Sequence, residues 1–263
     1  MTAQDFTITF LGTGTSQGVP VIGCTCEVCR SDDPHDKRLR TSILISSEST
    51  NIVIDCGPDF RQQMLRENVD HLEAVVLTHE HNDHIIGMDD VRPFNFQKRE
   101  DMPVYASDRV AKELHTRFAY VFAENPYPGA PMLKLHHISR ATGFTIHDLE
   151  LTPIEVQHGS IPVLGFRIGP FTYITDMKNI SDQEKEKVKG SRYLVVNALH
   201  HQEHHSHLNL REALAFIREI APERALLTHM SHRMGIHQEV NRTLPAGVEL
   251  AYDGLILGMR NEE

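Results

Sequence analysis

Short runs of apolar residues, alternating or continuous, recur along the chain and predict a fold rich in strands. Turn-forming residues separate 41–46 from 51–55, so this pair is expected to form a hairpin. The predicted strands span 6–11, 41–46, 51–55, 73–77, 102–106, 149–157, 171–175, 192–199, 224–228, 248–251 and 255–259.

Fewer segments show helical periodicity. Ser107 is expected to cap a helix whose apolar residues recur about once per turn. Asn209 and Glu212 have the spacing of a capping box and predict a second amphipathic helix. Further helices are predicted at 58–68 and 237–244, whereas 87–92 and 125–131 are predicted to be loops.

Composition indicates an ordered globular protein. The chain has 263 residues, of which 40% are hydrophobic and 24% charged. We expect residues 1–263 to form a single domain. The formal net charge of -10 disfavours nonspecific attachment to nucleic acid or to an anionic membrane, because both need a positive field.

The N-terminal stretch and the arrangement of the cysteines favour a reducing intracellular compartment. The start, MTAQDFTITF, lacks a basic segment followed by an apolar core, and no run approaches the roughly 18 apolar residues of a membrane span. Three of the four cysteines are bunched, unlike a disulfide framework. We therefore expect a soluble cytoplasmic protein.

The densest chemical signal is the sequence THEHNDH, which directly follows the predicted strand 73–77. It supplies His79, His81, Asp83 and His84, whose imidazole and carboxylate groups suit zinc and related divalent ions. A solvated polar loop would explain one or two of these residues. Four ligand-type side chains at such close spacing predict a metal site.

Three later predicted strands also end in ligand-type residues. His158, Asp176 and His229 follow the strands 149–157, 171–175 and 224–228. A buried core histidine is the usual interpretation of one such residue, but it does not explain the repeated placement. Most of the histidines near 200–205 are expected to be solvated.

Cys24, Cys26 and Cys29 lie within six residues and could hold zinc if a fourth ligand joined them. Cys56, alone in a predicted strand, is expected to be a small core residue. The preceding loop has glycines at 12, 14 and 18, so it lacks the G-x-G-x-x-G pattern of dinucleotide-binding proteins.

These motifs together resemble the metallo-β-lactamase superfamily, and the resemblance covers essentially the whole chain. It implies an α/β (α+β) fold, a four-layer αββα sandwich with the site at one edge of two sheets. It also implies a dinuclear site for zinc or manganese. One ion would take His79, His81 and His158, the other Asp83, His84 and His229, with Asp176 bridging them.

Within this superfamily, the cysteine cluster resembles that of the bacterial phosphoribosyl cyclic phosphate phosphodiesterases and their relatives. That likeness implies a structural zinc held by Cys24, Cys26, Cys29 and His232. It also places His207, just before a predicted helix, as a non-ligand residue that donates a proton to the leaving oxygen or binds phosphoryl oxygens. His207 and Asp83 are the expected catalytic residues.

The resemblance implies hydrolysis of a small or cyclic phosphodiester by a hydroxide held between the metals. Pre-tRNA processing is an alternative, but those nucleases usually carry an RNA-gripping insertion where His158 and Asp176 here lie only 18 positions apart. Thioester hydrolysis is another alternative. In a different class, the chain could be a noncatalytic metal-binding accessory protein in cofactor biosynthesis.

The partner expected from this comparison is a small-molecule phosphodiester, with no membrane or large nucleic acid. The chain could also form a homodimer. The roles of Asp89, Asp90, Arg92 and Tyr127 are left open, since solvated loop residues are as compatible with the pattern as substrate contacts are. The natural substrate and the physiological metal are likewise open.

Overall fold

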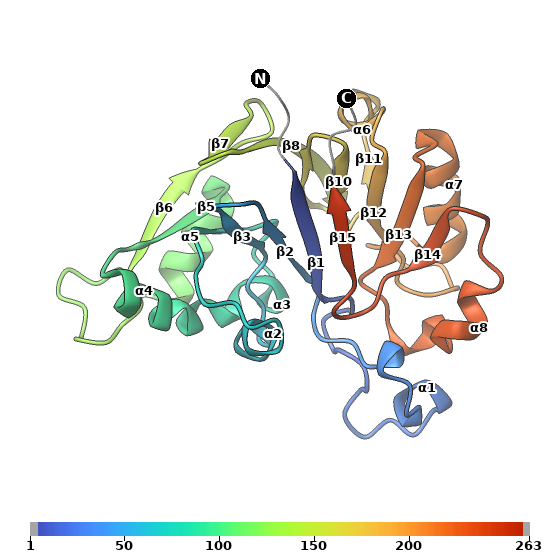
Figure 1. The fold of residues 1–263 in the computed structure, drawn as a ribbon, viewed down its shortest axis with the longest axis horizontal. Coiled ribbons are helices and arrows are strands. Elements are labelled where there is room, and N and C mark those ends of the chain that lie inside the picture. Colours follow the sequence, from blue (N-terminus) through green and yellow to red (C-terminus); the bar gives the residue numbers. More distant parts are fainter. Residues whose placement is uncertain (1–4, 260–263) are drawn as a thin grey trace.

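The computed structural model describes residues 5–259. Residues 1–4, part of the N-terminal stretch considered above, lie outside this range. Within it, the strands form two sheets (Figure 1). The first sheet, in spatial order, contains β15 (Ile256–Met259), β1 (Phe6–Gly12), β2 (Ser42–Ser46), β3 (Asn51–Ile54), β4 (Ala74–Val76), β5 (Met102–Ala106) and β6 (Leu133–His137).

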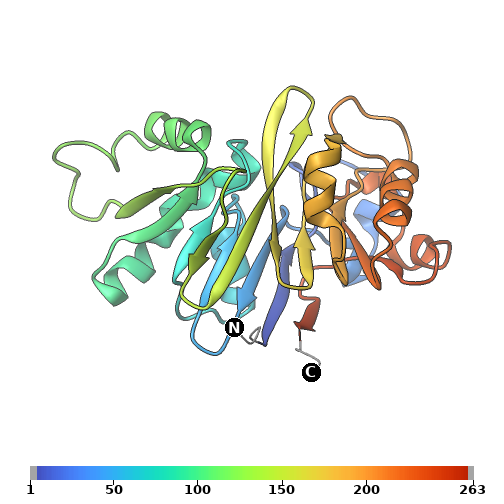
Figure 2. The same ribbon diagram turned by 90° about the horizontal axis from the view of Figure 1, so that it is seen from above.

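The second sheet contains β11 (Asn179–Ile180), β8 (Leu149–His158), β9 (Ile161–Ile168), β10 (Phe171–Tyr173), β12 (Tyr193–Asn197), β13 (Arg224–Thr228) and β14 (Val248–Leu250), with β7 (Phe144–Ile146) paired to β8. The long β8–β9 hairpin is prominent when the molecule is viewed from above (Figure 2). The α-helices are α1 (Glu27–Arg30), α2 (Phe60–Arg66), α3 (Asn82–Ile85), α4 (Arg92–Lys98), α5 (Asp108–Arg117), α6 (Asp182–Val188), α7 (Leu210–Ile220) and α8 (His237–Asn241). Three short 3₁₀ helices are η1 (Pro34–Asp36), η2 (Ile86–Val91) and η3 (His232–Met234) within the described range.

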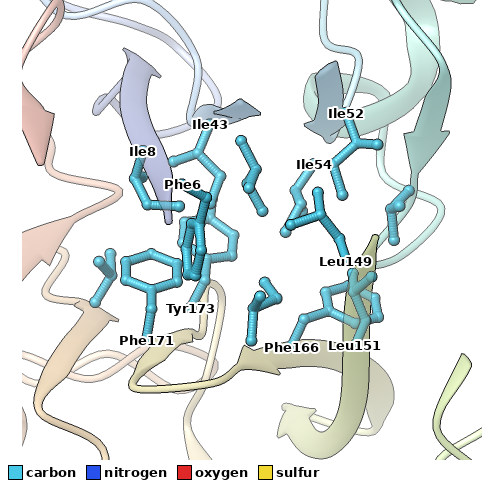
Figure 3. Packing of buried hydrophobic residues seen from close by; sticks show 14 of the residues in the cluster. Phe6, Ile8, Ile43, Ile52, Ile54, Leu149, Leu151, Phe166, Phe171 and Tyr173 are labelled. Carbon is cyan, nitrogen blue, oxygen red and sulfur yellow. The ribbon is translucent and has the colours of Figure 1, made fainter. Parts of the chain in front are cut away.

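The inner faces of the two sheets enclose one hydrophobic core. Ile8 and Ile54 of the first sheet meet Phe166 and Tyr173 of the second in a single buried cluster (Figure 3). These side chains alternate along their strands with residues that face outward, as a pleated sheet requires.

Helices cover the outer faces. Ala213 and Ile217 of α7 belong to one buried cluster with Val196 of the second sheet. On the other side, residues of α2 and α5 pack with Val53 and Val75 of the first sheet. The order of layers is therefore α, β, β, α, which confirms the predicted sandwich.

Most predicted elements are confirmed to within one or two residues, including the β2–β3 hairpin and the caps of α5 and α7. Ser107 accepts a hydrogen bond from the Val110 amide, and both hydrogen bonds of the Asn209–Glu212 capping box are present. Among the described helices, none is both long and apolar enough to cross a bilayer.

The prediction of a loop at 87–92 is wrong, because the chain continues from α3 into η2 and then α4. Met88 and Val91 are buried, which the polar appearance of the sequence conceals. Gly87 permits this packing, because a Cβ there would lie 2.0 Å from the carbonyl oxygen of Gly57.

Parallel pairing sets the position of the site. β3 and β4 run parallel in one sheet, and β10, β12 and β13 run parallel in the other. The carboxyl ends of these strands therefore lie at one edge of each sheet, where the predicted ligands follow the strands.

Candidate metal centre

His79 and His81 follow β4 and bring two ring nitrogens together. His79 Nε2 lies 3.0 Å from His81 Nδ1. The Nδ1 of His79 lies 3.0 Å from the Thr78 hydroxyl, which in turn donates to the Asp55 carboxylate. Burial holds the pKa of His79 well below its usual range, so the ring is neutral, as a metal-binding imidazole must be.

His158 ends β8 and lies against this pair. Its ring centroid is 5.1 Å from that of His81, and its Nδ1 donates to the backbone carbonyl of Ser206 at 2.8 Å. This contact fixes the tautomer and leaves Nε2 free as a ligand. Histidines that bind metals commonly donate their second ring nitrogen in this way.

Asp83, His84 and His229 form a second group, in which one ligand atom from each lies within 4.8 Å of the others. His84 Nε2 is 3.2 Å from an Asp83 oxygen, and His229 Nε2 is 3.8 Å from the same oxygen. Burial raises the pKa of Asp83, but the neighbouring His84 and His229 lower it more. The pKa of Asp83 therefore lies well below its usual range.

Asp176 lies between the groups. One of its oxygens is 3.4 Å from His84 Nε2, and the other is 3.2 Å from His229 Nε2. Asp176 is also within 4.8 Å, ligand atom to ligand atom, of His79. Although burial raises its pKa, His229 and His84 hold that pKa well below the usual range, so the carboxylate is charged.

These residues fit a divalent metal. The Nε2 of His84 and both ring nitrogens of His229 are buried and make no hydrogen bond within the described part of the chain, although the two Nε2 atoms lie 3.4 and 3.2 Å from oxygens of Asp176. A buried polar atom without a partner is costly. Nitrogen and carboxylate oxygen donors at these positions are the set that zinc and manganese accept.

The backbone is strained at the same place. Asp176 and His229 have φ values of 56° and 57°, and Asp55 has 68°. Residues other than glycine rarely adopt this left-handed conformation, and such strain concentrates at functional sites.

Asp55 is a site residue that the sequence prediction missed. Its carboxylate lies 2.6 Å from His84 Nδ1 and accepts a hydrogen bond from the Thr78 amide at 2.9 Å. It orients one predicted ligand and the residue before another. The available signal was its position immediately after an apolar strand, which it shares with the predicted ligands.

His207 lies within hydrogen-bond distance of one predicted ligand and close to another. Its Nε2 is 3.1 Å from Asp176 Oδ1, and it forms a group with His158 and Asp176 whose ligand atoms lie within 4.8 Å of one another. Burial lowers its pKa to about 4, against the opposing effect of Asp176. The position allows either the predicted contact with substrate or a ligand role.

The cysteines and His232 meet as predicted, although 203 or more positions separate them. His232 Nδ1 lies 3.2, 3.4 and 3.5 Å from the sulfurs of Cys24, Cys26 and Cys29. Tetrahedral zinc with ordinary bond lengths implies a sulfur–nitrogen separation of about 3.5 Å. This cluster therefore fits a structural zinc, and Cys56 is a separate buried core residue.

A buried network joins the loop that follows β1 to the active-site edge. The Met230 amide donates to the Thr13 carbonyl at 2.9 Å, and the Met230 carbonyl accepts from the Thr15 amide at 3.0 Å. The Thr13 hydroxyl accepts from Arg38 at 2.8 Å and donates to Asp253 at 2.8 Å. Met230 directly follows His229, so this network holds one predicted ligand in place.

The expectation that most histidines at 200–205 are solvated holds for His201 and His205, which are exposed, but not for His200 and His204. His200 is only 7% exposed, and His204 is half-buried with its Nδ1 3.2 Å from that of His207. His205 is exposed, as expected. The loop closes on itself, because the Leu199 amide donates to the Leu208 carbonyl and the Leu210 amide donates to the His200 carbonyl, each at 2.9 Å.

The residues whose roles the sequence left open lie in η2, α4 and the loop 125–131, and several of them interact with one another. Arg92 forms an ion pair with Asp89 at 2.6 Å, and its guanidinium lies 3.5 Å from the Tyr127 hydroxyl. Asp89 also accepts from Tyr120. Asp90 is half-buried beside Cys56. These contacts hold η2, the start of α4 and the loop 125–131 together.

The fold and the site together are those of a known family of metal-dependent proteins. A family model described as the beta-lactamase superfamily domain matches residues 50–230, and the chain belongs to this family. The predicted resemblance to this superfamily is thereby confirmed. The fold family implies divalent metals, in agreement with the residues gathered here.

Individual relatives narrow the comparison. A diphosphatase of the PhnP family, known from its crystal structure, has a TM-score of 0.91 and 38% identity, with 97% of each chain covered. A Porphyromonas gingivalis protein named octanoyltransferase is 45% identical over 93% of this chain and 50% of its own length. Coenzyme PQQ synthesis protein B of Rhodopseudomonas palustris is 31% identical over 46% of this chain and 42% of its own. The chain thus spans about half the length of the curated relatives it matches.

Proposed function

We propose that the chain is a metal-dependent phosphodiesterase that acts on a small or cyclic phosphodiester. The position of Asp176 carries the proposal, because its two oxygens lie 3.4 Å from His84 Nε2 and 3.2 Å from His229 Nε2. A carboxylate placed between two groups of ligand-type side chains is suited to bridge two ions. The likeness to a PhnP-family diphosphatase supports hydrolysis at phosphorus.

The proposed ligands are His79, His81 and His158 for one ion, and Asp83, His84 and His229 for the other, with Asp176 shared. Bound divalent ions would lower the pKa of water and stabilise charge at phosphorus. Zinc and manganese are both proposed, since the nitrogen and oxygen donors suit either ion. We also propose that Cys24, Cys26, Cys29 and His232 hold a structural zinc.

The chain's own residues then orient the reacting groups. Asp55 fixes the ring of His84, and the Ser206 carbonyl fixes the ring of His158. The charged carboxylate of Asp83, whose side chain is only 14% exposed, faces the other proposed metal ligands. His207 Nε2 is placed to donate a hydrogen bond to the phosphoryl oxygens or to the oxygen that leaves phosphorus, since a ring of pKa about 4 is neutral near pH 7.

The shape of the chain supports a small substrate. Between His158 and Asp176 the described structure contains only β9, β10 and their turns, and β8 pairs directly with β9 from His158 onward. No arm that could grip RNA emerges from residues 159–175. The net charge of -10 also disfavours a polyanion as large as tRNA.

Thioester hydrolysis is the second candidate, and the name of the Porphyromonas relative favours it because octanoyl transfer is acyl chemistry. That relative is about twice as long as the aligned region, so its name need not describe the half that aligns. An accessory role in cofactor synthesis is a further alternative, supported by the shorter match to the PQQ synthesis protein.

A substrate panel separates these functions. Protein loaded with zinc or manganese should hydrolyse bis-p-nitrophenyl phosphate or a 2′,3′-cyclic nucleotide, and Asp176→Asn should abolish this activity. An octanoyl thioester in the same panel tests the second candidate. Preference for the thioester would replace the proposal, and turnover of neither at full metal loading would support the accessory role.

A further inference from the structure

Two residues of the loop after β4, Glu80 and Asn82, separate the proposed metal ligands and have no part in the metal centre described above. His79 and His81 turn toward each other, with ring nitrogens 3.0 Å apart. Glu80 is also a ligand-type residue, yet within residues 5–259 its carboxylate belongs to no group of converging ligand atoms. It is directed at α5 instead, where its Oε1 accepts from Arg109 Nε at 2.6 Å.

Few backbone hydrogen bonds hold this loop. In the described part of the chain, the amides of Glu80 and His81 donate to no acceptor. The Thr78 carbonyl accepts from the Leu164 amide at 3.0 Å, before the ligands begin. The His81 carbonyl accepts from the His84 amide at 3.0 Å, where α3 begins. Between these two points the conformation of the loop depends on contacts made by its side chains.

The carboxylate of Glu80 is buried and depends on Arg109 for its charge pairing. The Glu80 side chain is 7% exposed, and its Oε2 has no hydrogen-bond partner among the described residues. Removing one partner of a buried charged pair is costly, because the other charge is left without compensation. Arg109 is 52% exposed, so its removal would empty little space in the core. Loss of its guanidinium should therefore act on Glu80, and through Glu80 on the ligand at either side.

Helix α5 is a fixed support for this contact. Its residues Val110 and Leu114 belong to one buried cluster with Leu77, which lies just before the loop. Further along the same helix, Arg117 donates to the side-chain oxygen of Asn82. Both side chains that separate the proposed ligands are thus held by arginines of one helix, on the side of the loop away from the metal centre.

We propose that Arg109 is a positioning residue for the metal centre. Through its ion pair with Glu80, it holds His79 and His81 in the arrangement in which both can bind one ion. The inference rests on the metal ligands of the proposed function, and it does not depend on which ester the chain hydrolyses. Residues that orient ligands in this way commonly change metal affinity 10- to 100-fold when they are removed.

The affinity of the metal-free full chain for Mn²⁺, measured in competition with a chelator, tests this role. Mn²⁺ favours oxygen and nitrogen donors over the thiolates of the cysteine cluster, so it reports on the active site. Arg109→Met keeps the length of the side chain but has no donor, and it should weaken Mn²⁺ binding about tenfold or more. Arg224→Met is the matched control, because Arg224 Nε also lies 2.6 Å from a carboxylate, that of Glu249, at the end of β13 far from His229. The control should bind Mn²⁺ as the wild type does.

Two further comparisons separate positioning from a general loss of packing. Arg109→Gln places an amide donor where Nε lies in arginine, so its Mn²⁺ affinity should stay within about threefold of the wild type. Glu80→Ala removes the same contact from the other side and should weaken binding about tenfold. The double variant, Arg109→Met with Glu80→Ala, should bind no more weakly than Arg109→Met alone, because residues that act through one contact are not additive.

Equal Mn²⁺ affinity of Arg109→Met and the wild type would overturn the inference and leave the metal centre standing, as would additive losses in the double variant. A wild type that binds no Mn²⁺ would refute the proposed metal centre and the inference with it. Should Arg109→Met fail to fold, Glu80→Gln and Glu80→Ala decide the question. Glu80→Gln keeps an acceptor for Arg109 and should bind about tenfold more tightly than Glu80→Ala, and equal binding would reject the role of Arg109.

Discussion

Asp55 and His84 form a fully buried pair, with an oxygen of the carboxylate 2.6 Å from the Nδ1 of the imidazole. Burial raises the pKa of Asp55 against the lowering effect of His84, while Asp83 and Asp55 overcome the effect of burial on His84 and raise its pKa well above the usual range. The pair leaves His84 Nε2 directed at Asp83 and Asp176. It is the arrangement by which a carboxylate orients a metal-binding histidine.

Asp55→Ala should therefore lower active-site metal affinity about 10- to 100-fold. Metal content after dialysis against a competing chelator measures this. Asp70→Ala is a matched control, because Asp70 lies 2.6 Å from His71 in an exposed pair. Equal metal retention by both variants would contradict a supporting role for Asp55.

A ring of pKa about 4 is neutral near pH 7, so His207 acts as a hydrogen-bond donor, and His207→Ala should reduce kcat about 10²- to 10³-fold, the usual contribution of one fixed donor to developing charge. Its active-site metal content should match the wild type. His205→Ala, an exposed histidine in the same loop, should have little effect on kcat. Loss of metal from His207→Ala would instead make His207 a ligand, which its group with His158 and Asp176 also allows.

Cys26→Ser should remove about one zinc ion per chain, because each thiolate of such a site is a ligand. The proposed zinc would join the N-terminal loop to η3, so its loss should also lower Tm by roughly 5–10 °C, equivalent to about 2–3 kcal/mol for a chain of this size. Cys56→Ala, in the core, should reduce stability without changing the zinc count. Unchanged zinc in Cys26→Ser would refute the structural site.

His237 should make stability depend on pH. Its Nδ1 accepts from Arg38 at 3.0 Å, and burial, the charge of Arg38 and the adjacent His35 lower its pKa to about 4, against Asp36 and Asp33. An unfolded histidine has a pKa near 6.5. The folded state therefore binds fewer protons between these values, and this contribution to stability is lost as pH falls from about 6.5 to about 4.

Denaturant titrations across that pH range measure the effect. His237→Asn preserves a possible acceptor for Arg38 but cannot titrate, so the loss of stability with falling pH should be smaller in this variant. An identical pH dependence in both proteins would show that His237 is not the group responsible.

The gathering of the proposed ligands could be predicted from sequence because several strands end in ligand-type residues, and strands that run in the same direction bring those ends together. His79 to His84 are also local in sequence. Cys24, Cys26 and Cys29 were recognisable as a cluster, whereas His232 was assigned by resemblance and needed the three-dimensional fold to be tested.

The other elements and site residues could not be predicted because they depend on tertiary packing. Strand β9 contains Pro162 and Gly165, which obscure its pattern, yet Gly165 is required because an added Cβ would lie 2.8 Å from the Tyr173 carbonyl oxygen. His200 and His204 lack any periodic signal, and they lie in a loop that hydrogen bonds between Leu199 and Leu208 close. Asp55 directly follows an apolar strand, as the predicted ligands do, but its supporting role is apparent only from its contacts with Thr78 and His84.

The most direct measurement is one titration of metal-free protein in which bound zinc or manganese and hydrolysis of bis-p-nitrophenyl phosphate are followed together. Activity should rise as the active-site ions bind and reach its maximum near three ions per chain, roughly two at the active site and one at the cysteines. Asp176→Asn should bind the cysteine-site ion without gaining activity. Full metal loading of the wild type without phosphodiester hydrolysis would contradict the proposed function.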